Sequence, residues 1–230
     1  EDTLDNLADT PENRAFIEKV RPAFEKYKNI GVRIEDDMLV TAGGVEWMTK
    51  HLPRTIADIE RLERLPVDGL FCAETAHDPF ISATLAVEHS SRAEVGTAIA
   101  VAFARNPMTL ANIGWDLQAF SKGRFVLGLG SQIKPHITKR FSMEWSHPAP
   151  RMREMVLAIR AIWDTWLYGT KLDFRGDFYT HTLMTPFFDP GPNPHGNAKI
   201  FLAGVGELMT EVVGEVCDGF LCHGFTTERY

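Results

Sequence analysis

The sequence predicts an α/β protein with a parallel sheet, and two features carry this prediction. An apolar run from Arg124 to Leu129 is bounded by glycines, as expected of a strand buried on both faces. From residue 67 onward, strand-like and helix-like segments alternate, which favours parallel strands joined by crossover helices. The strand-then-glycine pattern returns at residues 199–206. Because α/β folds bind cofactors at the carboxyl ends of such strands, both glycine-rich ends are candidate cofactor sites.

The composition limits the partners that this chain can have. Its 230 residues are 44% hydrophobic and 24% charged, which is typical of a globular protein. The formal net charge of -7 argues against nucleic acid and anionic membranes as partners. No apolar run approaches the roughly 18 residues of a membrane span. The three cysteines are an odd number and lie in strand-like segments, so we expect reduced core thiols in a cytoplasmic protein.

The first 60 residues predict a small α+β segment. Thr10 stands before a proline and is expected to cap a helix, and apolar residues recur at helical spacing from Arg14 to Tyr27, although Pro22 interrupts this pattern. Alternating apolar and polar residues from Ile30 to Gly44 predict a half-exposed antiparallel strand. Thr55 to Leu65 is expected to be helical.

The elements predicted from residue 61 onward follow one another with few interruptions. The expected strands are 67–74, 93–101, 124–129, 199–204 and 217–222. The expected helices are 79–89, 106–120, 150–167 and 207–216. Arg175 to Tyr179 is typical of a hairpin turn, and residues 186–197, rich in proline and glycine, are expected to form a loop.

Two stretches near the beginning of the chain, Val32–Asp37 and Leu52–Glu60, resemble the C-terminal end of the pita-bread metallopeptidases, the Xaa-Pro aminopeptidases and prolidases. The resemblance implies that Glu35 would bridge two metal ions. The other ligands of such a site would lie upstream of Glu1, and one carboxylate does not hold a dinuclear site. The alternative for Glu35 is a solvated strand carboxylate.

Six short motifs follow one another in residues 63–230. They are Asp68–Pro79, Gly96–Ile99, Gly123–Gly130, Arg151–Glu154, Gly176–Tyr179 and Ala203–Gly206. In this order and spacing they resemble the luciferase-like monooxygenase superfamily, in particular its deazaflavin-dependent oxidoreductases. The resemblance implies a (β/α)8 TIM barrel that binds FMN or the deazaflavin coenzyme F-420 at the carboxyl ends of its strands.

The fold class that we predict is therefore α/β, with an incomplete (β/α)8 TIM-barrel-like domain over residues 61–230 preceded by the α+β segment of residues 1–60. Two departures from the family pattern lead to this expectation. The first barrel strand, expected before residue 60, is replaced by the peptidase-like segment. The last two strands are expected after Tyr230.

The candidate catalytic residues are His77 and Glu74, which follow the strand at 67–74. Histidine titrates near neutral pH, and barrel folds carry their reactive groups at this end of the strand. Either residue could be the acid or base that accompanies hydride transfer. The alternative is a loop whose function is to cap the next helix through Asp78.

The candidate cofactor-binding residues lie at three later strand ends. They are Thr97, Ala98, Ile99, Gly128, Gly130, Ser131, Gly204 and Gly206. The resemblance places a non-proline cis peptide bond, backing the cofactor ring, at residues 97–99. Gly204 and Gly206 precede a helix and match a phosphate-binding turn. For Gly128 and Gly130, tight packing between strand and loop is the alternative.

These observations lead to one main functional hypothesis and two alternatives. The main hypothesis is an oxidoreductase that uses F-420 or FMN to transfer hydride to or from a small organic substrate. The alternatives are a metallopeptidase fragment, which alone would need metal ions, and an inactive chimeric or truncated product. Unpaired strand edges of an incomplete barrel favour association, so a homo-oligomer is one possible state. The sequence leaves open the substrate and the choice between F-420 and FMN.

Overall fold

The structure is a computed structural model, and it describes residues 10–11, 13–15, 17–18, 33–34, 38–41, 44–47, 56–65 and 67–223. By their internal contacts, residues 1–32 and 33–230 form two units. The boundary predicted near residue 60 concerns the families that the two segments resemble, and it stays a prediction.

In the first unit the described residues 11, 13–15 and 17–18 are helical. The hydroxyl of Thr10 accepts a hydrogen bond of 3.1 Å from the Asn13 backbone N–H. The Thr10 carbonyl accepts another, of 2.9 Å, from the Arg14 backbone N–H. Thr10 is therefore the N-cap that the sequence predicts, because its side chain satisfies a backbone donor that the first turn leaves open.

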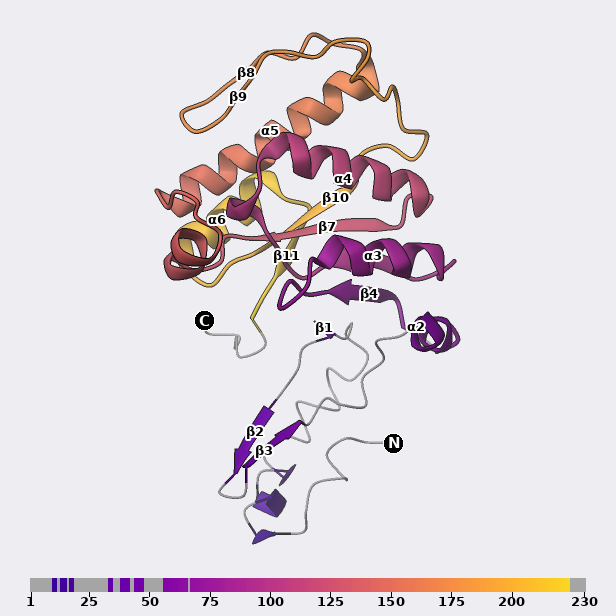
Figure 1. Cartoon of the computed structure of the whole chain (residues 1–230), viewed down its shortest axis with the longest axis vertical. Coiled ribbons are helices and arrows are strands. Elements are labelled where there is room, and N and C mark those ends of the chain that lie inside the picture. Colours follow the sequence, from indigo (N-terminus) through magenta and orange to yellow (C-terminus); the bar gives the residue numbers. More distant parts are fainter. Residues whose placement is uncertain are drawn as a thin grey trace. The chain divides into compact units, whose positions relative to one another are not determined.

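The second unit is built on a parallel sheet that curls as in an incomplete TIM barrel (Figure 1). Its seven strands in the described residues are β1 (Arg33–Ile34), β4 (Gly69–Cys72), β5 (Glu94–Thr97), β6 (Ala100–Val101), β7 (Phe125–Gly130), β10 (Lys199–Ala203) and β11 (Gly219–Leu221). The order is β1-β4-β5-β7-β10-β11, with β6 also paired to β7. All these pairs are parallel, which confirms the prediction from alternating strands and helices.

The prediction of one antiparallel strand from Ile30 to Gly44 is confirmed in its second part and wrong in its first. β2 (Met38–Thr41) pairs antiparallel with β3 (Gly44–Trp47). Arg33 and Ile34, however, form β1, which runs parallel to β4 opposite Phe71 and Cys72. A sheet strand thus lies inside the segment in which the sequence analysis expected no barrel strand. Alternation of apolar and polar residues reports which face is buried but not the direction of the neighbouring strand.

The helices of the second unit agree closely with the sequence. They are α2 (Ile56–Glu63), α3 (Pro79–Glu88), α4 (Pro107–Phe120), α5 (Pro148–Tyr168) and α6 (Glu207–Val216). Helices α3 and α4 each begin with a proline that directly follows the N-cap residue, Asp78 in α3 and Asn106 in α4. Helices α3, α4 and α6 pack on the strands, and α5 packs on α4 and α6 (Figure 1).

Helix α5 supplies the largest buried side chains of the core. Trp163 is fully buried and Trp166 is 1% exposed. The Trp163 indole N–H donates a hydrogen bond of 2.9 Å to the Ala111 carbonyl of α4, so burial leaves no unsatisfied donor. The two helices approach closely because Gly114 faces the same indole, where a Cβ atom would lie 2.7 Å from Trp163.

A second contact joins the motif on α5 to the hairpin of β8 (Phe174–Arg175) and β9 (Thr180–His181). The Glu154 carboxylate accepts hydrogen bonds of 2.9, 2.8 and 2.5 Å from the backbone N–H groups of Asp177, Phe178 and Tyr179. Gly176 leaves room for this carboxylate, since a Cβ atom there would lie 2.1 Å from it. The two motifs at 151–154 and 176–179 therefore form one structural unit, and the predicted hairpin turn is confirmed.

The cysteines depart in part from the expectation of core thiols. Cys72 and Cys217 are partly buried, and burial raises the pKa of each thiol to about 11. Cys222 is exposed and follows β11 instead of lying within it. In the described part of the chain, no helix has the length and apolar character needed to cross a membrane.

Two helical glycines provide a test of this packing. Replacing Gly214 in α6 by alanine should raise the free energy of unfolding by about 0.5–1 kcal/mol, because alanine favours the helix and its Cβ meets nothing within 4 Å. Replacing Gly114 in α4 by alanine should lower it by about 1–3 kcal/mol, because the indole of Trp163 occupies the space. Urea denaturation measures both, and equal effects would contradict the described contact between α4 and α5.

Candidate functional site

The candidate residues meet because neighbouring parallel strands end at the same edge of the sheet. Glu74 and His77 follow β4, Thr97 ends β5, Ala98 and Ile99 join it to β6, and the two glycines lie in the second half of β7. The Glu74 backbone N–H donates a hydrogen bond of 3.1 Å to the Ile99 carbonyl. Thr97 contacts Gly128. The structure thus brings three of the four predicted segments together.

The strand predicted at 93–101 is divided. The Ala98–Ile99 peptide bond is cis, as the sequence comparison implied, and it separates β5 from β6. From Gly96 to Ala100 the chain advances four residues, while β7 advances three, from Val126 to Leu129. One extra residue is therefore accommodated beside β7, as in a β-bulge.

The Thr97 side chain replaces the ladder bonds that this bulge interrupts. Its hydroxyl donates a hydrogen bond of 2.6 Å to the Gly128 carbonyl and accepts one of 3.0 Å from the Gly128 N–H. Thr97 is fully buried. On the side of β5 and β6, a side-chain hydroxyl thus satisfies both backbone groups of Gly128 in place of a strand partner.

This bulge requires a glycine at position 128. A Cβ atom on Gly128 would lie 1.7 Å from the Thr97 carbonyl oxygen, and backbone cannot yield to such a contact without a shift of the strands. A Cβ atom on Gly130 would lie 2.8 Å from the Ile99 side chain, whose end can move. Tight packing, the alternative in the sequence analysis, therefore accounts for Gly128, and the role of both glycines in cofactor binding stays a prediction.

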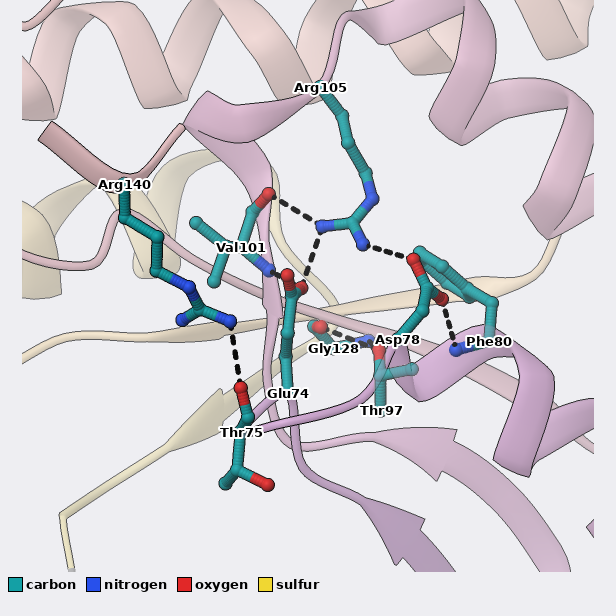
Figure 2. A network of polar contacts seen from close by, with 9 residues as sticks. All are labelled: Glu74, Thr75, Asp78, Phe80, Thr97, Val101, Arg105, Gly128 and Arg140. Carbon is teal, nitrogen blue, oxygen red and sulfur yellow. Dashed lines mark hydrogen bonds and ion pairs between the residues drawn. The ribbon is translucent and has the colours of Figure 1, made fainter. Parts of the chain in front are cut away.

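An ion-pair network holds the loop after β4 (Figure 2). The Arg105 guanidinium donates a hydrogen bond of 2.6 Å to the Glu74 carboxylate and another of 2.6 Å to the Asp78 carboxylate. The Glu74 carboxylate also accepts a hydrogen bond of 2.8 Å from the Val101 N–H. Burial alone would lower the pKa of Arg105, but its hydrogen bonds and the charges of Glu74 and Asp78 raise it.

His77 lies on the exposed part of the same loop. Asp78 caps α3, since its carboxylate accepts a hydrogen bond of 2.9 Å from the Phe80 N–H. The capping alternative is thus confirmed for Asp78 and leaves the role of His77 open. Arg140 closes the other side of the loop with a hydrogen bond of 2.8 Å to the Thr75 carbonyl (Figure 2).

Of the two glycines in the predicted phosphate-binding turn, Gly206 has free space beside it and Gly204 is packed against other residues. Gly206 is the N-cap of α6, has no side-chain cap, and leaves free space where a Cβ atom would lie. Gly204 is buried, and a Cβ atom there would lie 3.3 Å from Phe220. The carboxylate of Glu207 in the first turn is unfavourable for an anion at this helix end. Ser131 donates a hydrogen bond of 3.1 Å to the Gln132 carbonyl.

The metal site of the peptidase alternative cannot be placed, because Glu35 lies outside the described residues. Among the residues that the structure describes, no three histidine, cysteine or carboxylate side chains are grouped to hold a metal ion. The peptidase resemblance stays a prediction, and cleavage of an Xaa-Pro peptide in the presence of added metal would test it.

Arg105 is the site residue that sequence reasoning missed. It stands between the turn that follows β6 and the Asn106 cap of α4, so no periodic pattern marks it. The available signal was a cation placed just after a strand at the edge where Glu74 was already a candidate. Only the pairing of β4 with β5, and of β6 with β7, brings the two side chains together.

Comparison with known proteins finds similar sequences and a similar fold. A sequence profile described as luciferase-like monooxygenase matches residues 35–230. An uncharacterized protein of Mycobacterium tuberculosis is 62% identical over 169 residues, covering 74% of this chain and 50% of that protein. An F420-dependent glucose-6-phosphate dehydrogenase of Rhodococcus jostii is 30% identical over 156 residues, covering 65% of this chain and 44% of the relative.

A solved structure extends the comparison to the fold. The oxygenating constituent of 3,6-diketocamphane monooxygenase from Pseudomonas putida, in complex with FMN, superimposes with a TM-score of 0.55 at 15% identity. The match covers 65% of this chain and 45% of that one. This chain spans about half the length of the curated relatives that it matches.

The Arg105 network can be tested by stability. Replacing Arg105 by leucine should lower the free energy of unfolding by about 3 kcal/mol, because Glu74 would stay buried without its charge partner. The matched control is Arg175→Leu, whose ion pair with Asp173 is exposed and should matter by less than about 1 kcal/mol. Thermal and urea denaturation provide the measurement, and a similar small loss in both variants would argue against the buried network.

Proposed function

Because the chain belongs to the luciferase-like monooxygenase family, we propose that it is an oxidoreductase that uses F-420 or FMN. The substrate is a small organic molecule. The cofactor would bind at the carboxyl ends of β4, β5–β6 and β7. The named cofactors of the Rhodococcus relative and of the Pseudomonas structure support this choice of two.

The observation that carries the proposal is the locked bulge at residues 97–99. It sets the cis peptide Ala98–Ile99 between the Glu74 loop on one side and Gly128 on the other. The candidate residues from three strand ends are therefore held in one place by hydrogen bonds, as a cofactor site requires.

Two surfaces at this edge of the sheet fit the two parts of such a cofactor, its flat ring and its phosphate. Ile99 presents a partly buried apolar side chain over Gly130, where no Cβ interferes. Gly206 leaves open space at the N-cap of α6. The first surface suits a ring, and the second offers backbone donors, although Glu207 opposes an anion there.

Within this proposal, the bound flavin or deazaflavin would supply the hydride chemistry. His77 would hold or release the proton, because its side chain is exposed and forms no hydrogen bond with another described residue. Glu74 would position the loop, because its carboxylate is 4% exposed and is already held by Arg105 and by the Val101 N–H. The proposal thus separates the two catalytic candidates of the sequence analysis.

The cofactor test is a fluorescence titration of the purified chain with F-420 and, in parallel, with FMN. Saturable micromolar binding of one of them is expected, and it identifies the cofactor. Absence of binding by both would contradict the proposal for this chain.

The proton-transfer test compares His77→Gln with wild-type protein. With F-420 and glucose 6-phosphate as a trial substrate, kcat should fall by about a hundredfold, because general acid–base catalysis contributes at least this much. The affinity for the cofactor should stay within about twofold. His195→Gln is the control. His195 is exposed and lies next to Gly123, which precedes the amino end of β7, whereas His77 follows the carboxyl end of β4. Unchanged turnover in His77→Gln would exclude His77 as the acid or base.

A further inference from the structure

The loop after β7 lines a pocket in which only Arg140 has been given a role above, as the donor to the Thr75 carbonyl. The pocket has a volume of about 310 Å³, is open to solvent, and is lined by Pro135, His136, Lys139 and Arg140. The segment from Ser131 to Met143 contains Lys134 and these three basic residues but no aspartate or glutamate. In a chain of net charge -7, this is a local excess of positive charge.

The basic side chains form no ion pair with the carboxylates of the described residues. Among the described residues, no ion pair joins His136, Lys139 or Arg140 to an acidic side chain. His136 and Lys139 are exposed, and neither side chain forms a hydrogen bond with another described residue. Within the described part of the chain, the exposed ends of these two side chains are therefore accessible to a ligand.

The backbone that lines the pocket is fixed by a buried side chain and a hydrogen bond. Residues His136–Arg140 form a π-helical turn. This geometry is rare in proteins, and many of its occurrences lie at functional sites. Ile137 in this turn is fully buried in the core. The Thr138 hydroxyl donates a hydrogen bond of 2.9 Å to the Lys134 carbonyl. A ligand would thus meet a surface that is already ordered, which lowers the entropic cost of binding.

The pocket is attached to the loop that carries His77. Arg140 donates its hydrogen bond to the Thr75 carbonyl, two residues before His77 (Figure 2). The guanidinium also lies 4.8 Å from the centre of the Phe141 ring. Both segments lie in loops at the carboxyl ends of the strands, where barrel folds bind ligands.

From these observations we propose that His136, Lys139 and Arg140 form an anion subsite, which binds a phosphate or carboxylate group of a small-molecule ligand next to the His77 loop. Lysine and arginine bind such oxygens through short charge-assisted hydrogen bonds. The position beside His77 rests on the proposed function, whereas binding of the anion does not. The anionic group belongs either to the substrate or to the cofactor.

Calorimetric titration with inorganic phosphate and with pyrophosphate, at ionic strength held constant with sodium chloride, tests the subsite. The wild-type chain should bind saturably, and Lys139→Ala should weaken the affinity by about tenfold through loss of one charged contact. Lys139→Arg should restore most of the affinity. Lys171→Ala is the control, because Lys171 is exposed beyond the far end of α5 and carries the same charge. Absence of saturable binding, or an equal loss in Lys139→Ala and Lys171→Ala, would overturn the proposal.

Titration of the same variants with F-420 and FMN identifies the source of the anion. Weaker cofactor binding in Lys139→Ala assigns the subsite to the cofactor, and unchanged binding assigns it to the substrate. If wild-type protein binds phosphate but neither cofactor, the proposed function fails while the anion subsite stands. The two proposals are therefore tested separately.

Discussion

The candidate site depends on one extra residue in the β5–β6 segment opposite β7. A parallel pair cannot keep its ladder when one strand advances four residues against three. The Thr97 hydroxyl restores the lost bonds by contacting both backbone groups of Gly128. The cis peptide and the absence of a side chain at Gly128 belong to the same arrangement. Any ligand at this edge therefore meets a surface whose shape is determined by backbone packing.

Two arginines connect this bulge to the rest of the edge. Arg105 joins the turn after β6 to the carboxylates of Glu74 and Asp78, and Arg140 joins the loop after β7 to the Thr75 carbonyl. The loop after β4 is consequently held from both sides although it is largely exposed. Such a loop combines access for a ligand with a defined position for His77, which is the arrangement that acid–base catalysis needs.

Strands and helices were largely predictable because their signals are local. Proline behind Asp78 and Asn106 marked the beginnings of α3 and α4, and the apolar run of β7 marked a strand buried on both faces. The prediction at 30–44 was wrong for β1, although right for β2, because a half-apolar pattern does not specify the direction of the neighbouring strand. The π-helical turn at His136–Arg140 was missed because it spans too few residues for a periodic pattern.

The sequence by itself determined the alternation of strands and helices from residue 67 onward, the approximate helix ends and the family, because these depend on residues close together in the chain. Only the tertiary structure decided how the candidate residues act on one another. Glu74 and Arg105 are 31 residues apart, and so are Thr97 and Gly128, and their contacts exist because the strands between them pair in one register. It was also the tertiary structure that showed Gly128 to be packed against Thr97, a steric requirement that a glycine in a sequence cannot reveal.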